Sequence, residues 1–97
     1  MKIGLIYAMT GEIESLLTKE NAEPLQTAAG VSFYRIRPDV IACIGGVGKV
    51  NAAMAAQLLI SLYKPDLVLN AGVAGCFENV PIGTLVLAEG FLQHDVD

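Results

Sequence analysis

Three short, uninterrupted apolar runs constrain the fold of this 97-residue chain more than any other feature. They lie at residues 2–8, 40–44 and 66–71. Apolar runs of this length, with little polar alternation, are typical of strands that are covered on both faces of a sheet. The second and third runs each end in a glycine-rich turn. The sequence therefore predicts an α/β fold.

Two helices are predicted between these strands. The first covers residues 11–20, where Thr10 offers an N-cap hydroxyl and apolar residues recur at helical spacing, and Pro24 closes the segment after it. The second covers residues 49–63 and is expected to end before Pro65.

A β-hairpin is predicted from the β-branched and aromatic residues 31–36, a turn at 37–39 and the run at 40–44. A last strand is predicted over residues 84–88. Together with the helices these strands give a mixed sheet with flanking helices.

Composition excludes several classes of protein. A hydrophobic fraction of 54% with only 16% charged residues excludes disorder, and a net charge of −4 argues against nucleic acid or an anionic membrane as partner. No apolar stretch reaches the roughly 18 residues of a membrane span, and Glu12 and Glu14 come too early for a signal peptide. We therefore expect a cytoplasmic protein. So high an apolar fraction on so short a chain also predicts part of a larger fold or a chain that pairs with a partner.

The two cysteines, Cys43 and Cys76, lie in unrelated apolar and glycine-rich segments, and we expect both thiols to be reduced and buried. With one histidine and no CxxC motif, a zinc site cannot be built from Cys and His alone. His94 with Asp95 and Asp97 could suggest a metal site or a general base, but polar residues at a strand end are the favoured interpretation. We expect no metal.

The glycine-rich turn at residues 45–48 matches neither common nucleotide motif. A P-loop needs a first glycine where Cys43 stands and a hydroxyl residue where Val50 stands. A dinucleotide fingerprint needs a glycine or alanine where Asn51 stands. What remains is a strand-to-helix turn that lets a ligand approach the backbone near helix N–H groups. A tight turn without a ligand is an equally good interpretation.

Glu12 is the one carboxylate that the sequence singles out. It follows the first strand and begins a predicted helix, and α/β sheets bind ligands at the carboxyl ends of their strands. The helix dipole favours its anionic form there, and the carboxylate could orient a water or accept a proton from it. A surface glutamate favoured by the dipole is the alternative.

The turn at residues 70–75 (NAGVAG) follows the third apolar run and carries no reactive side chain. It can offer backbone N–H and C=O groups and a flat apolar floor, which suits a planar heterocycle such as a purine. Close packing of the turn, with no ligand, is the alternative.

Taken together, these segments resemble the methylthioadenosine/S-adenosylhomocysteine nucleosidases, which belong to the purine nucleoside phosphorylase and hydrolase superfamily. The resemblance spans nearly the whole chain, with the blocks in the family's order. The matching blocks are residues 1–6, 8–9, 12, 46–53, 64–66, 70–75, 82–86 and 94–97.

The resemblance implies the N-terminal half of a three-layer nucleoside phosphorylase-like fold, in a protein that is usually a homodimer. The implied reaction is hydrolysis of the N-glycosidic bond of an adenine thionucleoside, without a metal or organic cofactor. Glu12 matches the carboxylate that positions or deprotonates the attacking water.

The resemblance also implies six substrate-binding residues in three turns. They are Ala8 and Met9 on the ribose side, Val47 at the sugar or its 5′ substituent, and Val73, Ala74 and Gly75 bordering ribose, water and base.

Two departures from the family qualify these expectations. Val73 stands where the nucleosidases carry serine, so a hydroxyl that could hold the water is lost. Family members are also considerably longer, and the remainder carries the glutamate that grips ribose, the aspartate that protonates the purine and the stacking aromatic residue. Residues 1–97 are therefore expected to be a single incomplete domain, inactive alone.

Other functions stay open at this point. A phosphorylase is disfavoured, because the only arginines, Arg35 and Arg37, lie in the predicted hairpin and Glu12 would repel phosphate. Futalosine hydrolase or another purine nucleosidase is an alternative within the same class. A non-catalytic chain that binds nucleosides or only dimerises is an alternative of a different class.

Overall fold

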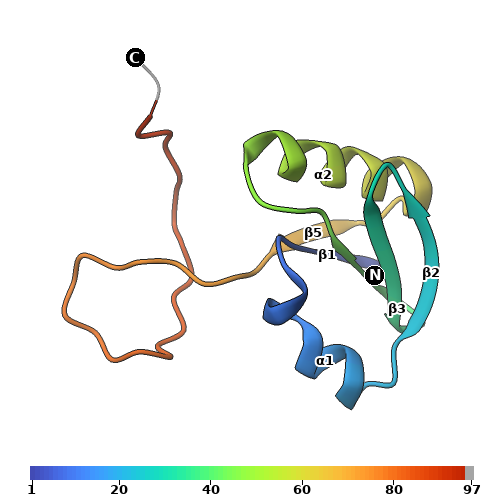
Figure 1. The fold of residues 1–97 in the computed structure, drawn as a ribbon, viewed down its shortest axis with the longest axis horizontal. Helices are drawn as coiled ribbons and strands as arrows, with labels where there is room; N and C mark the ends of the chain where they lie inside the picture. Colours follow the sequence, from blue (N-terminus) through green and yellow to red (C-terminus); the bar gives the residue numbers. More distant parts are fainter. Residues whose placement is uncertain (96–97) are drawn as a thin grey trace.

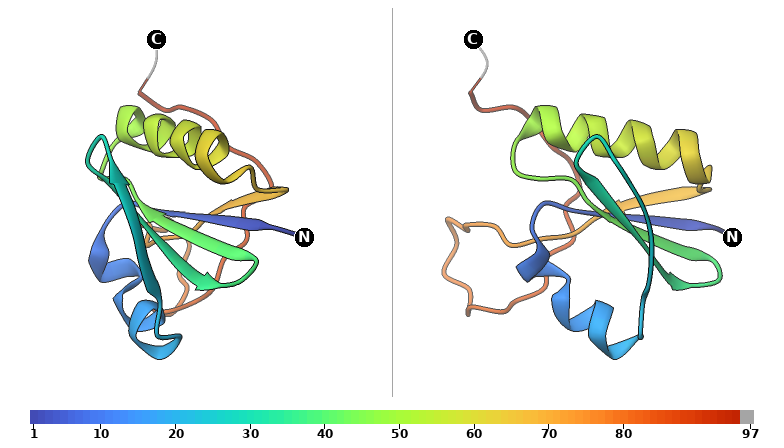
Figure 2. Two further views of the ribbon diagram at one scale, coloured as in Figure 1. Left: turned by 90° about the vertical axis from the view of Figure 1, so that its right-hand side faces the viewer. Right: turned by 45° about the vertical axis from the view of Figure 1, so that its right-hand side comes forward.

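A mixed five-stranded sheet forms the centre of the protein, with one helix on each face (Figures 1 and 2). The structure is a computed structural model that describes residues 1–95. In chain order its elements are β1 (Ile3–Tyr7), the 3₁₀ turn η1 (Thr10–Glu12), α1 (Glu14–Lys19), β2 (Glu23–Ala28), β3 (Val31–Arg37), β4 (Val40–Ile44), α2 (Lys49–Tyr63) and β5 (Leu67–Asn70).

The strand order β2-β3-β4-β1-β5 places β1 between two parallel neighbours. Ile3 pairs with Val40 of β4 on one side and with Leu67 of β5 on the other. The strands β2, β3 and β4 pair antiparallel. The predicted mixed sheet is therefore confirmed, and the carboxyl ends of β4, β1 and β5 meet at one edge.

Both faces of the sheet bury apolar side chains, as the uninterrupted run in β1 predicts. On the α2 face, Ile6 packs with Phe33 and with Leu59 of the helix. Gly4 permits this approach, because a Cβ there would lie 2.6 Å from Cδ2 of Leu59. On the α1 face, Ile13 packs with a second cluster that includes Ile36 and Ala42. The helix–sheet–helix layering is confirmed.

The second predicted helix is confirmed in full by α2, Lys49–Tyr63. It follows Gly48, whose φ is +100°, and it ends at Lys64, whose φ is +49°. This left-handed residue comes directly before Pro65, which cannot continue a helix.

The first predicted helix is shorter than expected. Residues 11–20 contain the end of η1 and the six-residue helix α1, with Ile13 between them in a non-helical conformation. The bend turns Ile13 into the core, where its side chain is 1% exposed. Thr10 lies within η1, and no side-chain cap hydrogen bond is formed there. Burial of one apolar side chain thus overrides the helical pattern.

The sequence pattern does not predict β2, Glu23–Ala28, which is an edge strand with mostly exposed side chains. Pro24 is tolerated because it stands near the start of an edge strand. The turn Ala29-Gly30 joins β2 to β3 with φ values of +51° and +81°. Positive φ at both positions is the mark of a type I′ hairpin turn, and alanine hides this signal in the sequence.

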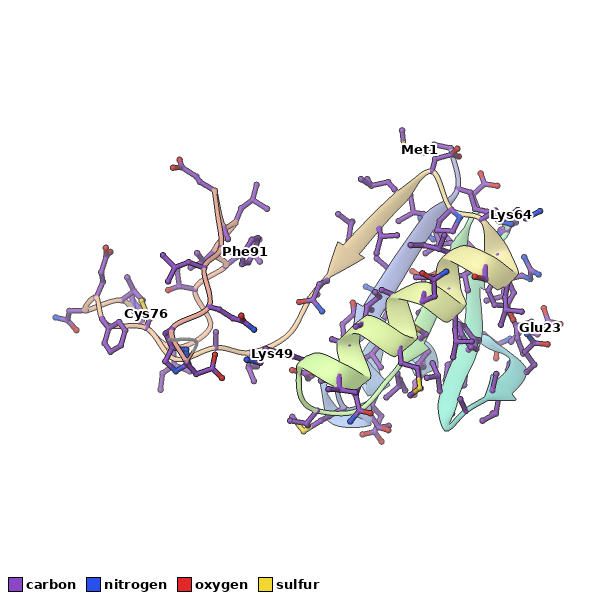
Figure 3. All side chains as sticks on the ribbon, turned by 90° about the horizontal axis from the view of Figure 1, so that it is seen from above. Met1, Glu23, Lys49, Lys64, Cys76 and Phe91 are labelled. Carbon is purple, nitrogen blue, oxygen red and sulfur yellow. The ribbon has the colours of Figure 1, made fainter. Side chains whose placement is uncertain are left out.

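The predicted strand over residues 84–88 is wrong: this segment is irregular and exposed. No described strand pairs with it, and a single strand without a partner leaves its backbone hydrogen bonds unmade. Figure 3 shows residues 71–95, marked by Cys76 and Phe91, extending away from the sheet. Within residues 1–95, no helix is both long and apolar enough to cross a membrane.

The two thiols differ in environment. Cys43, in β4, is fully buried, as expected, and burial raises its pKa to about 11. Cys76 is exposed, contrary to expectation, because the segment that carries it does not pack on the sheet. Both cysteines are free.

Candidate functional site

Backbone hydrogen bonds bring three turns together at the carboxyl edge of the parallel strands. The N–H of Gly45 donates to the carbonyl of Tyr7 at 2.9 Å, and the N–H of Gly46 donates to Ala8 at 3.0 Å. On the other side of β1, the N–H of Ala71 donates to Ile6 at 3.2 Å. The turns after β4 and β5 therefore both begin beside the end of β1.

Glu12 sits where the turns after β1 and β5 meet. Its Oε1 accepts hydrogen bonds from the N–H groups of Ala8 and Met9, each at 3.1 Å. Its Oε2 accepts one from the N–H of Val73, also at 3.1 Å. Four of the seven site residues predicted from the sequence are thus joined by three hydrogen bonds.

These donors also set the charge of Glu12. The N–H of Val73, followed by that of Met9, lowers the pKa of the Glu12 carboxyl below its usual value; burial opposes this, and the N–H of Ala8 adds a smaller lowering. The pKa of Tyr7, which is close by, is raised by burial and by the negative charge of Glu12. The carboxylate is therefore held in its ionised form.

Gly72 lets Glu12 reach the turn after β5. A Cβ built on Gly72 would lie 2.6 Å from Oε2 and 3.3 Å from Cδ of Glu12. That separation is too short for any side chain, so glycine is required here unless the carboxylate moves. The sequence pattern marks the turn but not this steric role.

Val47 lies on the third turn, between two glycines of positive φ, Gly46 at +98° and Gly48 at +100°. Its side chain is 67% exposed at the same edge of the sheet. The amide Nδ2 of Asn51 donates to the Val47 carbonyl at 2.7 Å. The structure thus places Val47 at the predicted edge, but no hydrogen bond joins it to Glu12 among the described contacts.

Ala74 and Gly75 follow Val73 in the exposed segment beyond β5. A Cβ on Gly75 would meet no atom within 4 Å. Ala74 lies with Val73 and Tyr7 along an open cavity of about 790 Å³. These two residues are near the site in sequence, and no hydrogen bond joins either of them to Glu12 among the described residues.

The amide of Asn70 is a feature that the sequence analysis missed. Its Nδ2 donates to the carbonyl of Ile6 at 3.2 Å, beside the Ala71 hydrogen bond to the same oxygen. Asparagine at the last position of the apolar run in β5 is the signal that could have revealed it, although β5 itself is mostly exposed rather than buried as the sequence predicts. Through this hydrogen bond, Asn70 links β1 to the start of the turn in which Val73 lies.

Up to residue 95, the polar residues near the end of the chain form no cluster with His94 that could hold a metal ion. Asp95 instead pairs with Lys49 at the start of α2, with both carboxylate oxygens 2.9 Å from Nζ. Asp97, which the sequence groups with them, lies outside the described residues. Within residues 1–95, no group of three His, Cys, Asp or Glu side chains could hold a metal ion.

Comparisons with known proteins agree on the family. Residues 2–97 match the model of the phosphorylase superfamily, and the chain belongs to that family. It is 41% identical over 101 residues to the 5′-methylthioadenosine/S-adenosylhomocysteine nucleosidase of Shewanella loihica. That alignment takes in the whole of this chain, which spans 44% of the relative's length.

Solved structures give the same picture of the fold. The nucleosidase of the same kind from Colwellia psychrerythraea 34H, in complex with adenine, superposes with a TM-score of 0.71 at 37% identity, over 81% of this chain and 34% of that one. Futalosine hydrolase of Helicobacter pylori strain 26695 superposes with a TM-score of 0.68 at 26% identity, over 77% of this chain and 34% of that one. The resemblance and fold class expected from the sequence are confirmed.

Proposed function

We propose that the protein carrying this sequence hydrolyses the N-glycosidic bond of adenine thionucleosides, methylthioadenosine and S-adenosylhomocysteine, with a water held by Glu12. The observation that carries the proposal is the set of three backbone N–H groups on the Glu12 carboxylate. An ionised carboxylate has about four acceptor positions, two on each oxygen. Three are used, so one position on Oε2 is left to accept a hydrogen bond from a water.

The pKa of Glu12 is lowered, so its carboxylate is a weak base. Glu12 is therefore better suited to orienting the water than to removing a proton from it before the C–N bond breaks. As the glycosidic C–N bond breaks, the sugar gains oxocarbenium character and the water oxygen forms the new C–O bond. The water proton passes to Glu12 at this stage, and the purine leaves with a proton from a general acid of the full-length protein. A fixed anion and a fixed water lower the barrier mainly by orientation and charge stabilisation.

The turns around Glu12 would form one wall of the nucleoside site. Ala8 and Met9 would border ribose, and Val47 would contact the sugar or its 5′ substituent. Val73, Ala74 and Gly75 would border ribose, water and base. The apolar side chains of these turns suit a thioether and a planar purine. The support is their common position at the carboxyl edge of β1, β4 and β5.

Water is favoured over phosphate as the nucleophile. Arg37 pairs with Glu20 at 2.9 Å, and Arg35 lies 3.6 Å from Glu23, all four on segments away from the carboxyl edge. Neither arginine of this chain is therefore placed to bind phosphate beside Glu12.

Futalosine hydrolysis is the second candidate, and Val73 is the observation that favours it. Valine adds a methyl group and removes a hydroxyl next to the N–H that binds Glu12. If the substrate differs from that of the nucleosidases with serine here, a different residue at position 73 is expected. The fold is compatible, because futalosine hydrolase of Helicobacter pylori superposes on this chain.

We further propose that residues 1–97 are the N-terminal part of one nucleosidase domain, that the protein acts as a homodimer, and that it works in the cytoplasm. The share of the Shewanella loihica relative that is matched supports the first point. Exposed apolar side chains on the segment after β5, such as Phe77 and Leu85, support further packing partners. Two free thiols are in keeping with a reducing compartment.

Adenine release by the purified proteins tests the proposal. The full-length protein should release adenine from methylthioadenosine and S-adenosylhomocysteine, while the 97-residue chain should release none. Consumption of futalosine alone would favour the second candidate. If the full-length protein cleaves none of these three nucleosides but binds one of them, a non-catalytic nucleoside-binding function would be favoured.

A further inference from the structure

Asn51, in the first turn of α2, stands behind the turn that carries Val47. Its Nδ2 donates to the Val47 carbonyl at 2.7 Å. That carbonyl precedes the helix, where the N–H of Ala52 donates to the carbonyl of Gly48 at 3.0 Å. The Asn51 side chain therefore supplies a donor at a position before the helical ladder begins.

The Asn51 side chain also lies close to Gly46. A Cβ built on Gly46 would lie 3.2 Å from Nδ2 and 3.4 Å from Cγ of Asn51. Asn51 thus lies beside Gly46 and forms a hydrogen bond with Val47. Asn51 is half-buried.

The turn needs this fixation because of its glycines. Its start is fixed to β1 through the N–H groups of Gly45 and Gly46, and its end is fixed by α2. Between these points Val47 lies between two glycines of positive φ, and glycine restricts the backbone least of all residues. The Asn51 hydrogen bond is the described side-chain contact that sets the orientation of the Val47 peptide.

We infer that Asn51 is a positioning residue, which fixes the Val47 peptide and so places the Val47 side chain against the sugar or 5′ substituent of the nucleoside. The inference rests on the proposed function, because Asn51 acts on the substrate only through Val47. Asparagine fits this task, since its short amide reaches the carbonyl of the fourth residue before it and donates without a charge. An aspartate carboxylate at position 51 would place an oxygen beside the Val47 carbonyl oxygen, and the two would repel each other.

Kinetics of full-length variants test the inference. Asn51→Ala removes the donor, and Asn51→Asp replaces it with an acceptor of nearly the same shape. Both should raise KM for methylthioadenosine about 2- to 12-fold, the range that one neutral hydrogen bond is worth. The value of kcat should stay within about twofold, because a wall that contacts unreacting atoms binds ground and transition states alike.

Gln57→Ala is the matched control. Gln57 lies on the same helix and donates from Nε2 to Oγ of Ser61 at 2.9 Å, also four residues away, but on an exposed part of the helix. It should leave both kinetic constants unchanged. If Asn51→Ala and Asn51→Asp lower the melting temperature but leave KM at the wild-type value, Asn51 is only a structural residue and the inference is overturned.

A second measurement needs no substrate. Backbone ¹⁵N relaxation should show lower order parameters at Val47 and Gly48 in Asn51→Ala than in the wild type, and no change in Gln57→Ala. Unchanged order parameters at these residues would overturn the positioning role. A wild-type protein that releases no adenine would instead refute the proposed function, and relaxation would still decide whether Asn51 fixes the turn.

Discussion

The backbone N–H of Val73 donates a hydrogen bond to Oε2 of Glu12 at 3.1 Å, across 61 positions of the chain. This contact joins the turn after β1 to the turn after β5. Glu12 also accepts from Ala8 and Met9, so its carboxylate depends on both strands for its position. Changes at either strand end should therefore affect the reaction.

Glu12→Gln should lower kcat of the full-length enzyme by about 10²–10⁴-fold and change KM far less, because holding and activating water matters chiefly in the transition state. Steady-state kinetics on methylthioadenosine measure this. Glu14→Gln, an exposed glutamate at the start of α1, is the control and should have little effect. A loss below about tenfold for Glu12→Gln would reduce Glu12 to a residue that braces the turns.

Gly72→Ala should lower kcat by about 10²-fold, since a Cβ 2.6 Å from Oε2 must push the Glu12 carboxylate aside, and small displacements of catalytic groups have costs of this size. Gly90→Ala is the control, because its Cβ would meet no atom within 4 Å and Gly90 lies outside the proposed site. Rate measurements on both variants test the steric argument. Equal losses in the two variants would count against it.

Acid should weaken the fold through Glu12. The pKa of this carboxyl is lowered in the folded state, first by the N–H of Val73, so its contribution to stability is present above the unfolded pKa of about 4.3. That contribution is lost as the pH falls through the lower folded pKa. Urea unfolding from pH 7 to pH 3 should show the stability gap between wild type and Glu12→Gln narrowing over the acid range. A gap that stays constant would show that the three N–H groups do not favour the ionised form.

Val73→Ser separates the two candidate substrates. If the protein is an adenine thionucleosidase, the added hydroxyl should help to hold the water and raise kcat/KM on methylthioadenosine about 2- to 12-fold. If futalosine is the substrate, the same change should leave its turnover flat or lower and improve turnover of methylthioadenosine. Assays of wild type and variant on methylthioadenosine, S-adenosylhomocysteine and futalosine distinguish these outcomes.

The two thiols should react at very different rates. Burial raises the pKa of Cys43 to about 11, whereas Cys76 is exposed. A thiol reagent at pH 8 should modify one cysteine in the folded chain and two after denaturation, as counted by mass spectrometry. Cys76→Ser should remove the fast reaction. Fast modification of Cys43 in that variant would mean that β4 is not buried as described.

The sequence reveals those parts of the fold that depend on local patterns. The apolar runs in β1 and β4 and the pattern of α2 are visible because burial dictates them. The run in β5 also forms a strand, but the burial expected of it is wrong, because β5 is an edge strand with mostly exposed side chains. The split between η1 and α1 is not visible, because it comes from packing Ile13 into a core that forms elsewhere. β2 is hidden for a related reason: an edge strand with exposed side chains has no apolar pattern.

The candidate site also has one part that the sequence reveals and another part that it does not. Glu12 stands out because a carboxylate follows a buried strand, a pattern within a few residues. Its contact with Val73 and its need for Gly72 depend on the register of β1 with β5, in which Ile6 pairs with Asn70. Nothing local to residues 70–75 encodes that register, so a family resemblance can suggest the role of these residues but their pattern alone cannot.

The position of β1 in the sheet has a consequence for the order of folding. The hairpins β2–β3–β4 join neighbours in the chain, whereas pairing Ile3 with Leu67 closes a loop of more than sixty residues. Loop closure of this size slows the formation of native contacts, so we expect β5 to dock after the hairpins. Mutations in β5 such as Val68→Ala should then give φ-values near 0 and mutations in β3 such as Phe33→Leu should give higher ones. On that order of events, the Glu12 carboxylate receives its last hydrogen bond only when the rest of the sheet is already built.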